Sequence, residues 1–201
     1  MPRILGLIVL IGLGYLAYTH YGYRYYLSQV KSNADEQMVI GPRDASITIV
    51  AYLDYNAPSS KRIYTTLINL LTTDRDIKMV IRPVESENKI SQLTTRLALA
   101  AKRQDKFMVV NNFFLTSQYE IDNKYIQGVM RTMGLKYDRL KTVMDSDAVT
   151  DEAVSYVREA KLLGIQSLPY FYIEHVKMPG ARIYTQSELR EVIERLRTRR
   201  L

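Results

Sequence analysis

Cysteine is absent from the 201 residues of this chain, as is tryptophan, and histidine occurs only at His20 and His175. Without cysteine the chain cannot form a disulfide, a zinc ribbon, an iron–sulfur cluster or a thiolate nucleophile. Two histidines are too few for a histidine-rich metal site, and a Ser-His-Asp triad would have to use one of them. No G-x-S-x-G motif, phosphate-binding loop or metal-ligand spacing accompanies His175, so we expect no resident metal or cofactor.

The net charge of +7 lies mainly at the two ends of the chain. Residues 1–34 hold three basic residues and no acid, and residues 186–201 hold five arginines against three glutamates. The rest holds 20 basic and 18 acidic residues, so it is nearly neutral. A nucleic-acid-binding protein usually concentrates positive charge on its folded surface. We therefore expect no nucleic-acid partner, whereas basic ends fit an anionic membrane surface.

The N-terminal region predicts a membrane anchor over residues 1–26. Residues 4–23 form a run of 20 uncharged residues that begins with ILGLIVLIGLGYLA, which is about the length of a spanning helix. Tyrosines gather at its far end, where a ring with a wet hydroxyl suits the membrane interface. The alternative is a signal peptide cleaved near Ser32-Asn33-Ala34, but that site lies about 20 residues beyond Leu13, farther than such sites usually lie. Residues 27–40 are predicted as a polar linker.

A strand–helix–strand unit follows the linker. The segment 46–54 (SITIVAYLD) is β-branched and almost entirely apolar, which is typical of a buried central strand. Pro58 and two serines then precede a run with apolar residues at helical spacing, as at a helix start. The segment 77–84 predicts a second strand, parallel to the first because a helix connects them.

The rest of the chain predicts a helical insertion over residues 88–163 and then a return to the sheet. Apolar stripes with polar starts and glycine stops indicate the insertion helices. These helices are predicted over residues 90–103, 105–117, 122–133, 137–144 and 148–163. A strand over 170–173, a hairpin turn at Pro179-Gly180 and a helix over 186–198 complete an α/β domain over residues 41–200.

Several motifs, in the right order, resemble the DsbA-like branch of the thioredoxin superfamily. Residues 41–50 (GPRDASITIV) resemble its entry to the first strand, and residues 53–62 (LDYNAPSSKR) resemble the x-D-Y-x-C-P-x-C-K-x part of its F-x-D-Y-x-C-P-x-C-K-x segment. Residues 163–171 (LGIQSLPYF) resemble the stretch that carries the family's cis-proline, here Pro169 after Leu168. The resemblance implies a thioredoxin-like fold with a helical insertion. Because that family is mostly exported or faces the bacterial periplasm, the resemblance also implies the orientation of the predicted anchor: a single helix in the bacterial inner membrane, with the domain facing the periplasm.

The chain departs from this family at both sulfur positions. Ala57 stands where the family has its attacking cysteine, and Ser60 stands where it has the resolving cysteine. Alanine has no nucleophilic atom, and a serine hydroxyl cannot form the mixed disulfide through which thiol exchange proceeds. The degenerate motif is therefore Ala57, Pro58, Ser59 and Ser60, and we expect no catalytic residue and no enzymatic activity.

What remains of the scaffold predicts binding. The cis-proline loop at Leu168 and Pro169 could pair its backbone with a peptide. We therefore expect protein partners. The expected setting is a bacterial envelope complex, of which this chain would be a subunit or an assembly factor. The helix start at Ala57 could hold an anion, unless Ser59 or Ser60 caps it. The alternative is a glutathione- or anion-binding enzyme that resembles kappa-class glutathione transferases, which use a serine near this helix start.

Overall fold

The computed structural model describes residues 6, 12, 14, 21–119 and 121–199. The chain divides into two compact units, Met1–Ala34 and Asp35–Leu201, and residues 21–32 of the first unit are helical. Among the described residues, no helix is both long and apolar enough to cross a membrane. Most of the anchor predicted over residues 4–23 lies outside the described residues, so the anchor stays a prediction.

The second unit is built on a mixed five-stranded sheet in the order β1-β3-β2-β4-β5. Its strands are β1 (Val39–Ile40), β2 (Ile47–Leu53), β3 (Ile77–Pro83), β4 (Tyr170–Ile173) and β5 (Val176–Pro179). Strands β2 and β3 are parallel, and every other neighbouring pair is antiparallel. This arrangement confirms the predicted strand–helix–strand unit, in which the crossover is helix α2.

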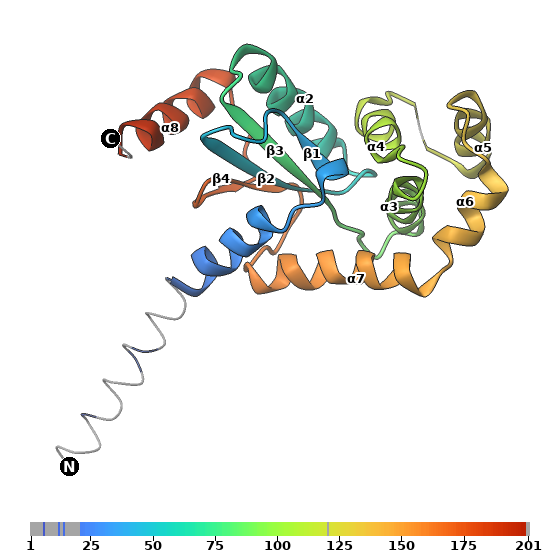
Figure 1. Ribbon diagram of the computed structural model, residues 1–201, viewed down its shortest axis with the longest axis horizontal. Helices are drawn as coiled ribbons and strands as arrows, with labels where there is room; N and C mark the ends of the chain where they lie inside the picture. The colour runs from blue at the N-terminus through green and yellow to red at the C-terminus, as the bar shows by residue number, and fades with distance from the viewer. Residues whose placement is uncertain (1–5, 7–11, 13, 15–20, 120, 200–201) are drawn as a thin grey trace. The chain divides into compact units, whose positions relative to one another are not determined.

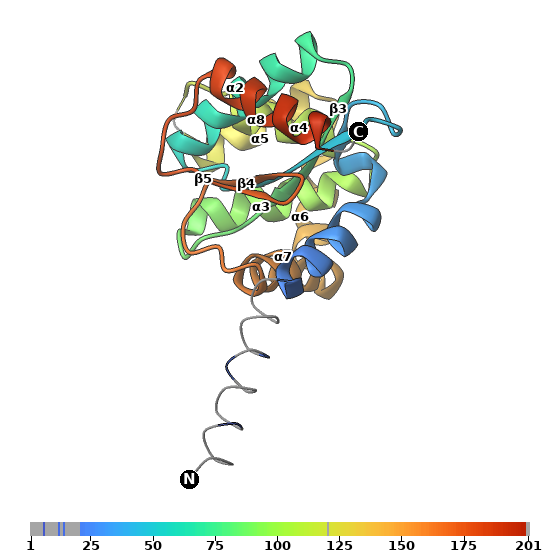
Figure 2. The ribbon, with the colours of Figure 1, turned by 90° about the vertical axis from the view of Figure 1, so that its left-hand side faces the viewer.

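Helices cover both faces of the sheet. They are α2 (Pro58–Thr73), α3 (Lys89–Lys102), α4 (Phe107–Thr116), α5 (Asn123–Thr132), α6 (Tyr137–Met144), α7 (Asp147–Leu162) and α8 (Gln186–Thr198). Helices α2 and α8 lie on one face and α7 lies on the other, while α3 to α6 gather at one end of the sheet (Figures 1 and 2). The predicted helical insertion is therefore present as α3 to α7.

The central strand β2 explains why the sheet forms here. All seven residues of β2 are buried, and six of them are β-branched, aromatic or leucine side chains that fit a strand covered on both faces. Helix α2 turns Ile63, Leu67 and Leu70 toward the core at helical spacing. At about 25 cal/mol per Å² of apolar surface removed from water, this burial is the main favourable contribution to folding.

Two predictions about the edges of the domain were wrong. Most of the predicted linker 27–40 is structured: residues 27–32 are helical, and residues 36–40 form a 3-10 helix (Glu36–Met38) and the edge strand β1. A linker was predicted because the surrounding residues are polar, but the main chain at Val39 pairs with Val80 on β3, and this pairing makes the segment a strand. The hairpin turn is at Glu174, which has a φ of 54°, and not at Pro179-Gly180, because Val176–Pro179 already pairs with β4.

Candidate functional site

The start of helix α2 carries the degenerate motif. Ala57 is the N-cap residue, with φ −91° and ψ 120°, and no side chain caps the helix. Pro58 occupies the first turn, and no acidic residue lies in that turn. The possibility that Ser59 or Ser60 caps this helix was wrong, because neither hydroxyl accepts a hydrogen bond from an N–H group of the first turn.

Ser60 is part of the interior. Its side chain is fully buried, and its Oγ accepts a hydrogen bond of 3.1 Å from the main-chain N–H of Asp54. The Asp54 carboxylate in turn accepts from the N–H of Asn56 at 2.9 Å. These two bonds shape the turn between β2 and α2. A thiol ligand bound at the surface would not contact the Ser60 hydroxyl, so of the two serines only Ser59, which is half-buried, could take the role of the serine in kappa-class glutathione transferases.

The loop before β4 has the main-chain geometry that the resemblance implied. The Leu168–Pro169 peptide bond is cis, and the Pro169 carbonyl accepts from the N–H of Gly180 at 2.9 Å. A Cβ atom on Gly180 would lie 2.2 Å from that carbonyl oxygen, so only glycine fits there. Ser167 is exposed and Leu168 is half-buried. Among the described residues, the N–H and C=O of Leu168 have no main-chain partner.

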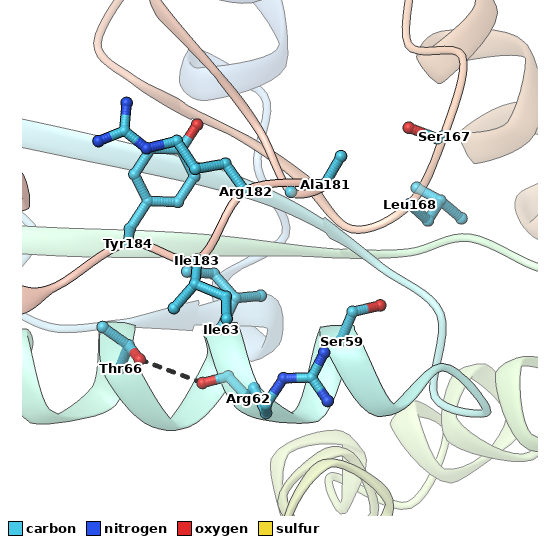
Figure 3. A pocket seen from close by; sticks show the side chains of 11 residues that line it. Ser59, Arg62, Ile63, Thr66, Ser167, Leu168, Ala181, Arg182, Ile183 and Tyr184 are labelled. Atoms are coloured by element: carbon cyan, nitrogen blue, oxygen red, sulfur yellow. Dashed lines mark hydrogen bonds between the residues drawn. The ribbon is translucent and has the colours of Figure 1, made fainter.

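Two hollows flank this loop, and both are lined in part by Ser167 and Leu168. The first, of about 230 Å³, lies between α2 and the segment after β5 (Figure 3). It is lined by Ser59, Arg62, Ile63, Thr66, Ser167, Leu168, Gly180, Ala181, Arg182, Ile183 and Tyr184. We call it the Arg62 hollow.

The second hollow has a volume of about 360 Å³ and lies where the end of β3 meets the C-terminal half of α7. Its walls are mostly apolar. It is lined by Asp54, Ala57, Val84, Ser86, Val157, Ala160, Lys161, Ile165, Gln166, Ser167 and Leu168. We call it the Val84 hollow.

The structure thus brings three of the six residues predicted for the site to the two hollows. Ala57 and Leu168 line the same hollow, and Ser59 and Leu168 line the other, although about 110 residues separate the two motifs in the chain. The other three line neither hollow: Pro58 is exposed, and Ser60 and Pro169 are buried. Sequence reasoning missed Arg62, which is only the variable last position of the motif over 53–62, and the segment 181–184, which belongs to no motif.

A buried polar cluster fixes the insertion against α2. The Tyr55 hydroxyl donates to Asn111 Oδ1 at 3.0 Å, and Asn111 Nδ2 donates to the Tyr64 hydroxyl at 3.2 Å. Burial raises the pKa of Tyr64 to about 12, so its hydroxyl stays neutral at physiological pH. Lys61 Nζ donates to the Ser117 carbonyl at 2.9 Å, and burial lowers the pKa of this amine. These contacts hold the start of α2 rigid relative to α4.

Fold and site together define a thioredoxin-like domain with a helical insertion, a cis-proline loop and no thiol. In agreement, the model of the family described as Thioredoxin matches residues 33–195, which is most of the chain. The chain belongs to this thioredoxin family.

Solved structures of similar fold include DsbA-like proteins. A thioredoxin-like oxidoreductase from Silicibacter pomeroyi is 25% identical, with a TM-score of 0.74, over 82% of this chain and 94% of its own. A periplasmic thioredoxin-like protein from Salmonella enterica is 21% identical, with a TM-score of 0.71, over 84% and 95%. The thiol-disulfide exchange protein α-DsbA2 from Wolbachia pipientis is 20% identical, with a TM-score of 0.72, over 88% and 96%.

Curated relatives are much longer than the matching region. The Na⁺/H⁺ antiporter NhaA of Herminiimonas arsenicoxydans is 24% identical over 142 residues, which is 70% of this chain and 23% of that protein. The chain spans about a quarter of the length of the curated relatives it matches.

Proposed function

We propose that this chain is a non-catalytic thioredoxin-fold protein that binds an extended segment of another protein at its cis-proline loop. The observation that carries the proposal is the position of Leu168, whose main-chain N–H and C=O have no main-chain partner among the described residues. They lie between two hollows that share this residue. An extended peptide can pair its main chain with the loop as one strand pairs with another, so that it hydrogen-bonds to both the N–H and the C=O of Leu168. Its side chains would then enter the two hollows.

The absence of redox chemistry follows from the residues at positions 57 and 60. Disulfide exchange requires a thiolate that attacks a sulfur atom and a second thiol that resolves the product. Ala57 and Ser60 supply neither, and Ser60 Oγ already accepts a hydrogen bond inside the fold. In this proposal the surface that presents substrates in a redox enzyme is kept for binding alone.

The proposal extends to the cellular setting. The apolar run over residues 4–23 would anchor the chain in the bacterial inner membrane, and the domain would face the periplasm as a subunit or assembly factor of an envelope complex. Two further points support this setting: the positive charge at both ends of the chain, and the antiporter name that its curated relatives carry.

The redox part of the proposal is tested with the full chain purified in detergent. We expect no turnover in insulin reduction or in oxidation of a dithiol peptide, with α-DsbA2 as the positive control; sustained turnover would refute it.

Calorimetry with glutathione tests the enzyme alternative. Tight binding that Ser59→Ala abolishes would favour that alternative over ours.

The binding part is tested by a pair of variants at one position. Leu168→Pro removes the main-chain N–H, and Leu168→Ala removes the side chain but keeps that N–H. Binding of fluorescein-labelled octapeptides is followed by fluorescence anisotropy, and circular dichroism checks that both variants are folded. We expect Leu168→Pro to abolish binding and Leu168→Ala only to weaken it. Equal binding by the two variants would exclude backbone pairing.

The setting is tested in bacterial cells that produce the full chain. We expect the chain to remain in the membrane pellet after alkaline carbonate washing, and to be digested by protease added to spheroplasts. A chain released by carbonate, or protected in spheroplasts and cut only after lysis, would contradict the proposed anchor and orientation.

A further inference from the structure

We infer that the bound segment carries an acidic side chain directly beside a large apolar one, with the acidic residue at Arg62 and the apolar residue in the Val84 hollow. This inference rests on the proposed function, because it names the class of peptide that the same loop would take. Four observations, on charge, exposure, wall chemistry and spacing, support it.

The Arg62 hollow has an excess of positive charge. Its lining contains two arginines and no acidic residue. The Arg182 guanidinium already forms a salt bridge with Glu188 and lies 5.3 Å from the centre of the Tyr184 ring. Arg62 differs, since none of the described carboxylates lies within salt-bridge distance of it. Its fork of N–H donors is free to bind a carboxylate with two parallel hydrogen bonds.

Arg62 also lies where a peptide paired with Leu168 could reach it. Its guanidinium extends along α2 toward Ser59, at the end of the helix that faces Leu168 (Figure 3). Across the hollow, Ile183 is 81% exposed although it is a large apolar side chain. A partner that lies between them can cover Ile183 with the stem of an acidic side chain while the carboxylate reaches Arg62.

The Val84 hollow differs in chemistry. Val84, Val157, Ala160 and Ile165 give it apolar walls. Its two charged residues, Asp54 and Lys161, have opposite signs, so the hollow has no net charge. Such a hollow gains most from an apolar side chain, at about 25 cal/mol per Å² buried. An acidic side chain would there meet the Asp54 carboxylate as well as Lys161.

The two hollows must be filled by neighbouring residues. Both share Ser167 and Leu168, so a chain paired with Leu168 has one hollow on each side. Successive side chains of an extended chain point to opposite sides. The residue that enters the Val84 hollow is therefore adjacent to the residue that contacts Arg62.

The test uses the full chain in detergent and four labelled octapeptides that differ only in their central pair: Leu-Glu, Leu-Gln, Leu-Lys and Ala-Glu. We expect Leu-Glu to bind most tightly, and Leu-Lys about tenfold more weakly, because attraction to Arg62 becomes repulsion. Ala-Glu is also expected to bind more weakly than Leu-Glu. The variant Arg62→Glu should reverse the order of Leu-Glu and Leu-Lys. Lys161→Glu is the matched control and should leave that order unchanged.

The outcomes separate this inference from the function on which it rests. If all four peptides bind equally and Leu168→Pro still abolishes binding, the loop binds peptides but the inference is wrong. If Lys161→Glu reverses the order and Arg62→Glu does not, the inference is also wrong, since the acidic residue would then contact Lys161. If none of the four peptides binds at millimolar concentration, the proposed function and the inference fail together.

Discussion

The Oγ atom of Ser60 accepts a hydrogen bond of 3.1 Å from the main-chain N–H of Asp54, across the turn that joins β2 to α2. The side chain at the position of a resolving cysteine thus supports the fold from within. The prediction that follows concerns stability. Ser60→Ala would leave a buried N–H without its acceptor, and we expect the free energy of unfolding to fall by about 1–2 kcal/mol.

Urea unfolding of Ser60→Ala, monitored by circular dichroism, measures this effect. Ser59→Ala is the matched control, because Ser59 is only half-buried and no described group bonds its hydroxyl; its change should stay within about 0.5 kcal/mol. Equal losses for the two variants would show that the Ser60 bond contributes nothing.

Restoring both thiols should restore redox chemistry. A thiol at position 57 would stand at the uncapped N-terminus of α2, where N–H groups and the helix dipole lower a thiol pKa below its usual value of about 8.5. We expect the double variant Ala57→Cys with Ser60→Cys to form an internal disulfide and to reduce insulin. Ala57→Cys alone should not complete the cycle. A double variant that keeps two free thiols in oxidising buffer would contradict the proposed likeness of this turn to the redox family.

Gly180 controls the position of the cis-proline loop. A Cβ atom there would lie 2.2 Å from the Pro169 carbonyl oxygen and 2.5 Å from its Cγ atom, so Gly180→Ala must displace the loop. Overpacking of this kind costs about 1–3 kcal/mol of stability. We expect that loss in urea unfolding, together with weaker peptide binding. Gly128→Ala is the control: a Cβ atom at position 128 would lie in open space, so this variant should lose neither stability nor peptide binding.

The buried pair of Arg82 and Glu159 ties α7 to the sheet. Arg82 Nε lies 3.0 Å from Glu159 Oε1, and the two side chains are 5% and 13% exposed. The Tyr52 hydroxyl also donates to that oxygen, at 2.7 Å. Glu159→Ala would leave a buried guanidinium without this carboxylate, and we expect a loss of about 3–5 kcal/mol.

The control for that variant is Glu191→Ala, which removes one partner of the exposed pair with Arg195. Both side chains of this pair are more than half exposed, so its loss should cost less than about 0.5 kcal/mol. Urea unfolding of both variants at one pH gives the comparison. A small loss for Glu159→Ala would mean that water reaches Arg82.

The ion pair between Asp74 and Arg197 should make the stability of the fold depend on pH. The two nitrogens Nη1 and Nη2 of Arg197 lie 2.9 and 3.0 Å from the Asp74 carboxylate oxygens, and these hydrogen bonds hold the pKa of Asp74 below its ordinary value of 3.8. A carboxyl group with a lowered pKa in the folded state stabilises the fold above pH 3.8, and this contribution is lost as the pH falls through its folded-state pKa.

We therefore expect Asp74→Asn to be less stable than the original chain by about 1 kcal/mol at pH 7. The difference should persist down to about pH 5 and shrink below pH 3.8. Asp44→Asn, which changes an exposed carboxylate that forms none of the described salt bridges, is the control. A difference that grows on acidification would have the wrong sign for this pair.

Much of the fold could be predicted because local patterns agree with it. The strand over 170–173 and the helices over 137–144 and 186–198 have the predicted bounds, and the other insertion helices differ by one or two residues at each end. Strand β1 was missed, since two residues carry no periodicity and only their pairing with β3 makes them a strand. The hairpin turn was misplaced because Pro179-Gly180 is a strong turn signal, whereas Glu174 is not a usual residue for positive φ.

The sequence by itself determined that this chain cannot exchange disulfides, because composition alone removes the sulfur atom that the reaction needs. It also determined the order of β2, β3, β4 and the helices α2 to α8, since apolar spacing is a local property. Only the tertiary structure decided that Arg62, Leu168 and Ile183 surround one hollow. These residues come from separate elements, and their proximity arises from packing of α2 and the segment after β5 around the loop, which no local pattern encodes.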